Sequence, residues 1–188
     1  DKSANPDFVA ADLIAQAEHD IYAQLILITD NKNLISLVNL SIKKQLKQLP
    51  KKSIASQSLK KFGLAILTNN KNKIPEIINT IAPEHLELYT NINNKIIKKI
   101  KNAGSIFIGK FSPEAIGDYI AGPNHVLPTS GSARFSSGLS VNDFLKRHSL
   151  IKITKTGIER LGPSVINLAK HENLDGHANS VKLRLKKE

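Results

Sequence analysis

YAQLILIT, residues 22–29, is an almost continuously apolar run of strand length. A strand covered on both faces has this composition, whereas a strand with one wet face alternates apolar and polar residues. Two more runs of the same kind follow, LAILT at 64–68 and SIFIG at 105–109. We therefore predict three core strands, with a further short strand in PEHLEL at 83–88.

Amphipathic helices are predicted around these runs. Asn5 followed by Pro6 has the form of an N-cap and first helical residue, and it opens a helix that continues to about His19. Pro50 and Gly63 end two later helices. The predicted helices after the first cover residues 31–49, 53–62, 71–81 and 91–102. Strands alternating with helices indicate a doubly wound, mostly parallel α/β sheet, an incomplete Rossmann-like domain over residues 1–139.

A stretch of poor periodicity over residues 119–138 follows SPEAIGDY, which has the length of one or two helical turns. Stretches this long without regular structure are usually functional or disordered, and its two prolines and apolar residues argue against disorder. The tail, residues 140–188, is predicted as a small helical/strand domain. It has a short helix at 141–147, a strand at 150–154, a helix at 156–171 interrupted by Pro163, and a helix at 175–186.

Composition sets limits on the function. The 188 residues include no cysteine, so any metal must be held by nitrogen and oxygen ligands. No apolar run reaches the ~18 residues of a membrane span, and we expect a soluble, cytoplasmic protein. Methionine is also absent, so we expect the chain to be a piece of something longer.

The formal net charge of +11 raises the question of nucleic acid binding. However, only four of the 27 basic residues are arginine, and the chain has nine aromatic residues. Base readout favours arginine, and single-strand binding needs aromatic platforms. A lysine-rich solvated surface explains the charge better than a specific nucleic acid site.

Four polar pairs stand out from the surrounding sequence. Each has an ordinary structural explanation when taken alone, such as a helix cap or a solvated strand edge. Taken together, four of these residues could form a zinc site built only from nitrogen and oxygen donors. They are Gln16, His19, Asp118 and His177. The pairs are Gln16 with His19, Glu84 with His85, Asp118 with His125, and Glu172 with His177.

Several long segments resemble the histidinol dehydrogenase family. They are SANPDFVAADLIAQAEHD, IAPEHLEL, AGSIFIG, GDYIAGPNHVLPTSGSARFSSGLSVNDFLKR and LDGHANSVKLRL, and they occur in the family's order. The family's chain is about twice as long, so this sequence resembles its C-terminal half. The resemblance implies a zinc enzyme that oxidises L-histidinol through L-histidinal to L-histidine with NAD, working as an intertwined homodimer.

The resemblance also assigns roles to individual residues. Glu84 and His85 match the acid/base pair, and His125 and Glu172 match substrate contacts; the substrate would also touch His85 and the zinc ligands. The tail reaches the partner subunit in the family, so Glu172 and His177 would complete the neighbour's site. The positions that match zinc ligands are Gln16, His19, Asp118 and His177.

The chain has no GxGxxG or Walker-type pattern after any strand. The resemblance accounts for this, because the family's NAD-binding residues and a substrate-contacting serine lie upstream of the region matched. We therefore expect this segment alone to be inactive. We also expect His177 to lie far from Gln16, His19 and Asp118 within one chain.

Two other functions fit parts of the sequence. A zinc hydrolase would use Glu84 and His85 to activate water, and it would turn over without NAD. A basic nucleic-acid-binding module would bind duplex DNA with an affinity that falls steeply with salt.

Overall fold

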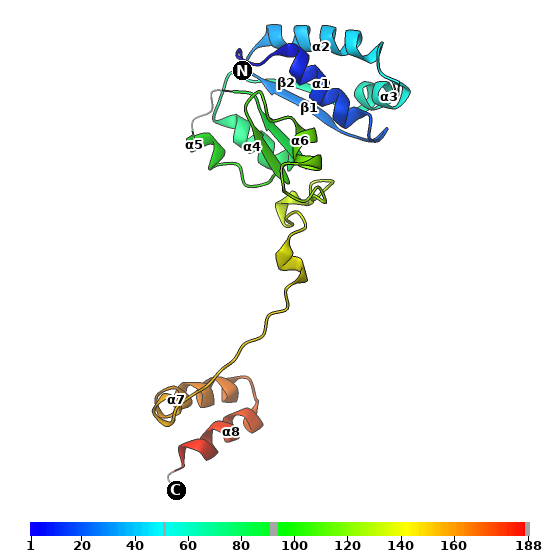
Figure 1. The fold of residues 1–188 in the computed structure, drawn as a ribbon. Coiled ribbons are helices and arrows are strands. Elements are labelled where there is room, and N and C mark those ends of the chain that lie inside the picture. Colours follow the sequence, from blue (N-terminus) through cyan, green and yellow to red (C-terminus); the bar gives the residue numbers. More distant parts are fainter. Residues whose placement is uncertain (51, 91–93, 187–188) are drawn as a thin grey trace. The chain divides into compact units, whose positions relative to one another are not determined.

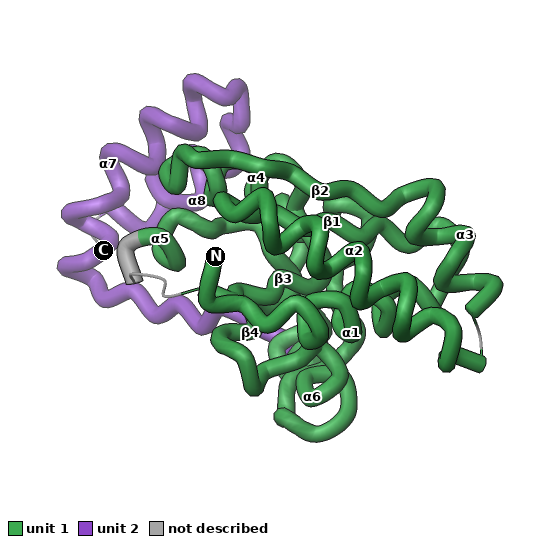
Figure 2. The backbone as a smooth tube through the Cα atoms, turned by 90° about the horizontal axis from the view of Figure 1, so that it is seen from above, with its two compact units in different colours: residues 1–144 green, residues 145–188 purple. Residues whose placement is uncertain are grey.

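A computed structural model describes residues 1–50, 52–90 and 94–186 of the chain. These residues divide into two compact units, Asp1–Phe144 and Leu145–Glu188, coloured separately in Figure 2. Each unit is described by itself below.

The first half of unit 1 is built around a two-stranded parallel sheet (Figure 1). After α1 (Pro6–Ala17), strand β1 (Leu25–Thr29) leads through α2 (Lys32–Leu46) and α3 (Lys52–Phe62) to β2 (Gly63–Leu67). Leu25 pairs with Gly63 and Thr29 with Leu67, so the strands are in register over their whole length. The predicted helix start at Asn5 is confirmed, since the Asn5 side chain accepts a hydrogen bond from the Asp7 amide.

Helix α1 lies at the centre of this half. Val9 and Ala10 on α1 pack against Leu34 and Val38 of α2, and Ala17 packs against β1 and α3. All of these residues are less than a tenth exposed. Burying an aliphatic side chain stabilises the fold by about 1.5–3 kcal/mol, so α1 is held firmly where its polar face meets the second half of the unit.

The second half of unit 1 repeats the parallel arrangement with shorter elements. Helix α4 (Lys73–Ile81) precedes β3 (His85–Leu88), and α5 (Asn94–Ile97) connects β3 to β4 (Ser105–Ile108). His85 pairs with Ser105 and Leu88 with Ile108. Helix α6 (Glu114–Tyr119) and two short 3-10 helices, Ser132–Arg134 and Val141–Phe144, complete the unit.

The sheet differs from the prediction. Parallel pairing is confirmed, but the described strands form two separate pairs, β1–β2 and β3–β4, instead of one doubly wound sheet. Leu64 and Leu67 of β2 are about half exposed, at 53% and 47%, and Ile108 of β4 is 54% exposed. The prediction of core strands was therefore wrong for β2 and β4, because the described helices leave much of their apolar surface uncovered.

The helix predicted over residues 91–102 is shorter in the structure. It covers Asn94–Ile97, and residues 91–93 lie outside the described part of the chain. Residues 100–103 are instead fixed by Asn79, which accepts from the amides of Lys101 and Asn102 and donates to the carbonyl of Lys99. This side chain replaces the helical hydrogen bonds that the periodicity predicted.

Unit 2 is a helical hairpin of α7 (Lys155–His171) and α8 (Asp175–Leu185). The helices approach closely at Gly162, where a Cβ atom would lie 2.9 Å from the Leu185 side chain. Pro163 lies inside α7 without ending it, so the predicted interruption was wrong. The predicted strand at 150–154 was also wrong. That segment has no paired strand among the described residues, and its Thr154 instead caps α7 by accepting from the Gly157 amide.

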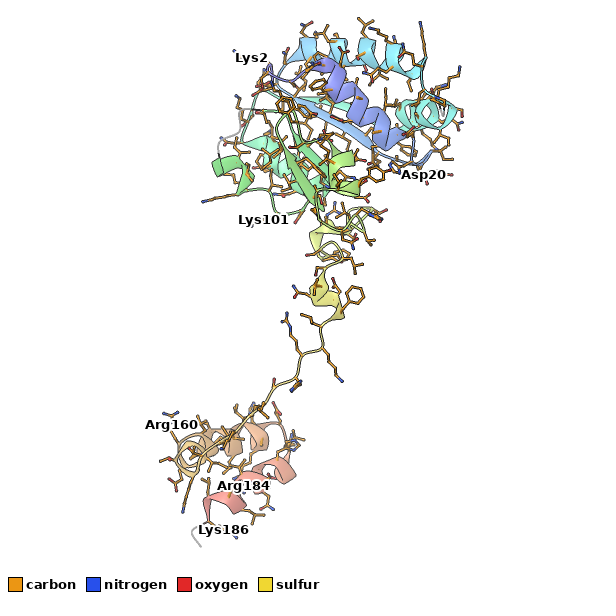
Figure 3. The ribbon with its side chains drawn as sticks, in the orientation of Figure 1. Lys2, Asp20, Lys101, Arg160, Arg184 and Lys186 are labelled. Carbon is orange, nitrogen blue, oxygen red and sulfur yellow. The ribbon has the colours of Figure 1, made fainter. Side chains whose placement is uncertain are left out.

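Charged side chains are found mainly on the surface, in agreement with the prediction of a solvated lysine-rich surface. Figure 3 shows Lys101 of unit 1 and Arg160 of unit 2 extending outward from the ribbon, and both are exposed. Among the described residues, no helix combines the length and apolar character needed to cross a bilayer.

Candidate active site

Three elements of unit 1 bring polar side chains together around His85. His85 begins β3, Gln16 lies in the last turn of α1, and Glu114 and Asp118 lie on α6. The His85 Nε2 atom is 3.4 Å from Asp118 Oδ1, and its Nδ1 atom is 3.8 Å from Glu114 Oε2. We call Gln16, His85, Glu114 and Asp118 the His85 cluster.

Gln16 closes the cluster from the side of α1. With its amide nitrogen facing Glu114, it donates to the two carboxylate oxygens of Glu114 at 3.0 and 3.1 Å and lies 3.3 Å from His85 Nδ1. The opposite orientation would set the amide oxygen against acceptors only. The amide therefore joins the first helix of the chain to residues about 70 and 100 positions later.

Helix α6 reaches His85 because a glycine lets it approach β4. A Cβ atom at Gly117 would lie 2.4 Å from Cε1 and 2.7 Å from Cζ of Phe107. The Phe107 ring in turn lies 6.0 Å from the His85 imidazole, centroid to centroid. Glu87 of β3 also holds α6, since its carboxylate oxygen accepts from the Glu114 amide at 2.9 Å.

Burial changes the acidity of the carboxyl group at the centre of the cluster. Glu114 is only 6% exposed. Desolvation, followed by repulsion from Asp118, Asp12 and Glu84, raises the pKa of Glu114 to about 7. At neutral pH this group is therefore divided between its neutral and charged forms, and a cation placed in the cluster would favour the charged form.

The donor set suits a metal ion. Ligand atoms of His85, Glu114 and Asp118 lie within 4.8 Å of one another. The buried His85 Nε2 atom has no hydrogen-bond partner in the structure, and such buried polar atoms usually have one. An imidazole, two carboxylates and a nearby amide match the nitrogen and oxygen ligands that zinc accepts in a chain without cysteine.

The predicted site residues are not all found in this cluster. Gln16, His85 and Asp118 belong to it, and the charge of Glu84 lies close enough to raise the pKa of Glu114. His19 is exposed just beyond the end of α1, and His125 is exposed on the loop after α6. Glu172 and His177 are exposed in unit 2, whose placement relative to unit 1 is not fixed, so the prediction of a distant His177 stays a prediction.

Comparison with known proteins identifies the family of the chain. The family model for histidinol dehydrogenase matches residues 1–185. The chain belongs to the histidinol dehydrogenase family. It is 54% identical over its full length to the histidinol dehydrogenase of Pelagibacter ubique and 50% identical, over 98% of its length, to that of Caldanaerobacter subterraneus.

A crystal structure of histidinol dehydrogenase from Elizabethkingia anophelis has the same fold. Its TM-score is 0.93, at 44% identity over 97% of this chain. The chain spans only part of these proteins, 44% and 43% of the two curated relatives and 42% of the crystallised chain. The prediction of family membership is thus confirmed, while the whole protein's activity belongs to the proposal below.

Glu114 is the residue of the cluster that the sequence prediction missed. It was hidden because SPEAIGDY has no strong periodicity and a lone glutamate after proline is a common helix start. The spacing of Glu114 and Asp118 could have indicated it, because residues four apart on a helix share one face. Because Asp118 was a predicted ligand, this shared face places Glu114 at the same site.

Proposed function

We propose that this chain forms the catalytic and zinc-binding part of a histidinol dehydrogenase. The reaction is the two-step oxidation of L-histidinol through L-histidinal to L-histidine, with NAD as the oxidant. The observation that carries the proposal is the meeting of Gln16, His85 and Asp118 in one buried cluster, within a chain that belongs to this family.

In the proposed metal site, Gln16, His19 and Asp118 come from one chain and His177 from the tail of the partner in a homodimer. Bound zinc would supply a Lewis-acidic centre that orients the imidazole and amino nitrogens of the substrate. Two of the proposed ligands, Gln16 and Asp118, already lie on either side of His85. His85 itself stays outside the proposed ligand set, although its ring lies near the carboxylates of Glu114 and Asp118, because the reaction needs the imidazole as a base. His125 and Glu172 would contact the substrate from the loop and from the partner's tail.

The first oxidation needs a base for the hydroxyl proton. His85 would accept that proton while a hydride passes from the carbinol carbon to NAD, which gives the aldehyde, NADH and one proton. The imidazole suits this role because groups on two of its sides hold the ring in place and because histidine is the side chain that most often acts as a general base.

The second oxidation needs water. Glu84 would take a proton from a water molecule as it adds to the aldehyde carbonyl. The proton that His85 gained in the first step would pass to the carbonyl oxygen, which gives a hydrate and leaves His85 able to accept a proton again. His85 would again accept the hydroxyl proton as the second hydride passes to a second NAD, and the carboxylic acid is formed. Glu84 directly precedes His85, and its charge lies close enough to the cluster to raise the pKa of Glu114, so we propose that both groups act on the bound substrate.

We propose, as the family resemblance implies, that the NAD site of the enzyme lies in the part of the relatives that this chain does not span. We therefore propose that the segment is inactive by itself and that activity tests need the full-length polypeptide.

Replacing Glu84 by glutamine in the full-length polypeptide tests the division of roles. Histidinal oxidation should fall by ~10²–10⁴, as for the loss of a general base, while histidinol oxidation to the aldehyde falls much less. Equal losses in both steps would remove the water-activation role. Turnover of an ester or amide substrate without NAD would instead favour a zinc hydrolase.

Zinc binding has its own test. His19→Ala should lower the zinc content of the purified protein and raise KM for histidinol, because the substrate binds through the metal. A fully metallated variant would refute His19 as a ligand. His148→Ala, which changes another exposed histidine outside the proposed set, is the matched control.

A further inference from the structure

A second group of polar side chains lies beside the His85 cluster, between α1 and β3. The Tyr89 hydroxyl donates to Asp12 Oδ2 at 2.7 Å. The Asp12 carboxyl is also hydrogen-bonded to the Glu87 carboxyl, which requires one of the two to carry a proton. We call Asp12, Glu87 and Tyr89 the seam cluster.

The seam cluster and the His85 cluster lie along the same two elements. Asp12 and Gln16 are four residues apart on α1 and therefore share a face. His85 and Glu87 are two residues apart on β3, and Tyr89 lies two residues further, directly after the strand. Side chains at this spacing lie on one side of a strand. Asp12 contacts Glu87 and Tyr89, whereas Gln16 contacts His85, which fixes the register of the helix against the strand.

The seam cluster also reaches α6. One carboxylate oxygen of Glu87 accepts from the Glu114 amide at 2.9 Å, at the residue that begins the helix. Glu87 thus contacts α1 through Asp12 and α6 through Glu114. These are the two elements that carry Gln16 and Asp118 to the imidazole of His85.

Hydrophobic contacts alone would not set this register. Burying carboxyl groups is costly, and apolar residues of similar volume often give equal or greater stability. A connected polar network holds one arrangement, since a shift by one residue would leave its half-buried members without partners. At this seam the polar contacts between α1 and β3 are those of Asp12 with Glu87 and Tyr89, so these contacts can set the register of the two elements.

We propose that Asp12, Glu87 and Tyr89 are positioning residues of the active site, which hold Gln16 and α6 at the correct separation from His85. This inference rests on the proposed function, because its expected effect is on the geometry of the proposed zinc ligands. The geometry of the seam itself can be tested without activity.

Tyr89→Phe in the full-length polypeptide removes one hydroxyl and keeps the ring. We expect the Gln16 amide to move out of hydrogen-bond range of His85 Nδ1 in a crystal structure, from the present 3.3 Å. We also expect zinc affinity, measured by competition with a chelator, to fall about tenfold, the lower end of the effect of outer-shell substitutions. Tyr22→Phe is the matched control, because the Tyr22 ring contacts Phe62 and Lys61 instead of the seam.

A pair of substitutions at Glu87 separates positioning from simple stability. Glu87→Gln keeps a donor for Asp12 and an acceptor for the Glu114 amide, so zinc affinity should stay within about threefold of wild type. Glu87→Leu removes both and should weaken zinc binding about tenfold or more. Rescue by glutamine but not by leucine is the expected signature.

Two results would overturn the inference. One is an unchanged Gln16–His85 separation in Tyr89→Phe together with wild-type zinc affinity in Tyr89→Phe and Glu87→Leu. The other is a lowered melting temperature in these variants without any loss of zinc affinity, which would make the seam merely structural. If the wild-type protein binds no zinc, the proposed function fails, and the crystallographic separation alone decides the positioning role.

Discussion

The Nε2 atom of His85 lies 3.4 Å from the Oδ1 atom of Asp118, on the opposite side of the imidazole from the amide of Gln16. These residues come from the first helix, the third strand and the sixth helix of unit 1. The imidazole is thus held between a neutral group and an acidic group. The two groups together favour one orientation of the ring.

Asp118→Asn should make Glu114 more acidic. Repulsion from Asp118 is the second largest cause, after burial, that raises the pKa of Glu114 to about 7. Removing that negative charge therefore lowers the pKa of Glu114 toward its ordinary value. The shift is measured by carbon NMR titration of the carboxyl group in metal-free protein. An unaltered Glu114 titration would show that the two carboxylates do not interact.

Gly117→Ala should damage both stability and the site. The new methyl group would lie 2.4 Å from the Phe107 ring, so either the ring or α6 must move. We expect a loss of about 1–3 kcal/mol in the free energy of unfolding, measured by urea denaturation, and a larger relative loss of zinc affinity. Gly176→Ala is the matched control, because no atom lies within 4 Å of that Cβ position, and its stability should rise by up to about 1 kcal/mol.

Sequence patterns predicted the local elements better than their assembly. Asn5 with Pro6 marked the start of α1, and YAQLILIT contained β1, because caps and apolar runs are local signals. Which strands pair is set by contacts between distant residues, and LAILT has the composition of a buried strand although Leu64 is 53% exposed in β2. The apolar surface that β2 shows here is consistent with a chain that spans under half of its relatives.

The sequence predicted only part of the candidate site, again because local motifs can be recognised and contacts between distant residues cannot. Gln16, His85 and Asp118 carried the family's motifs, and the structure brings their side chains together. Glu114 had no motif of its own, and its importance follows from burial, which no local pattern reports. Asp12 was also missed, because its role depends on Tyr89, which lies 77 residues later.

Glu87→Gln should change the pH dependence of stability. Burial and the hydrogen bond that protonated Glu87 donates to Asp12 raise the pKa of Glu87 to about 8 from an ordinary value near 4.5. Between these values the folded protein holds a proton that the unfolded chain releases, so the contribution of Glu87 is full below about pH 4.5 and is lost as pH rises to about 8. The free energy of unfolding of metal-free wild type, relative to Glu87→Gln, should therefore decline across this window. A constant difference would contradict a protonated Glu87.

Arg134→Gln should loosen the loop that carries His125. The Arg134 guanidinium donates to the carbonyl of Thr80 at the end of α4 and to the carbonyl of Gly131 within the loop, the latter at 2.7 Å. Without these charge-assisted hydrogen bonds, ordering the loop around substrate costs more free energy, so KM for histidinol should rise about threefold to tenfold with a smaller change in kcat. Steady-state kinetics of the full-length polypeptide, with Arg147→Gln as the exposed control, measure this. A fall in kcat at constant KM would instead place Arg134 in the chemical step and not in loop ordering.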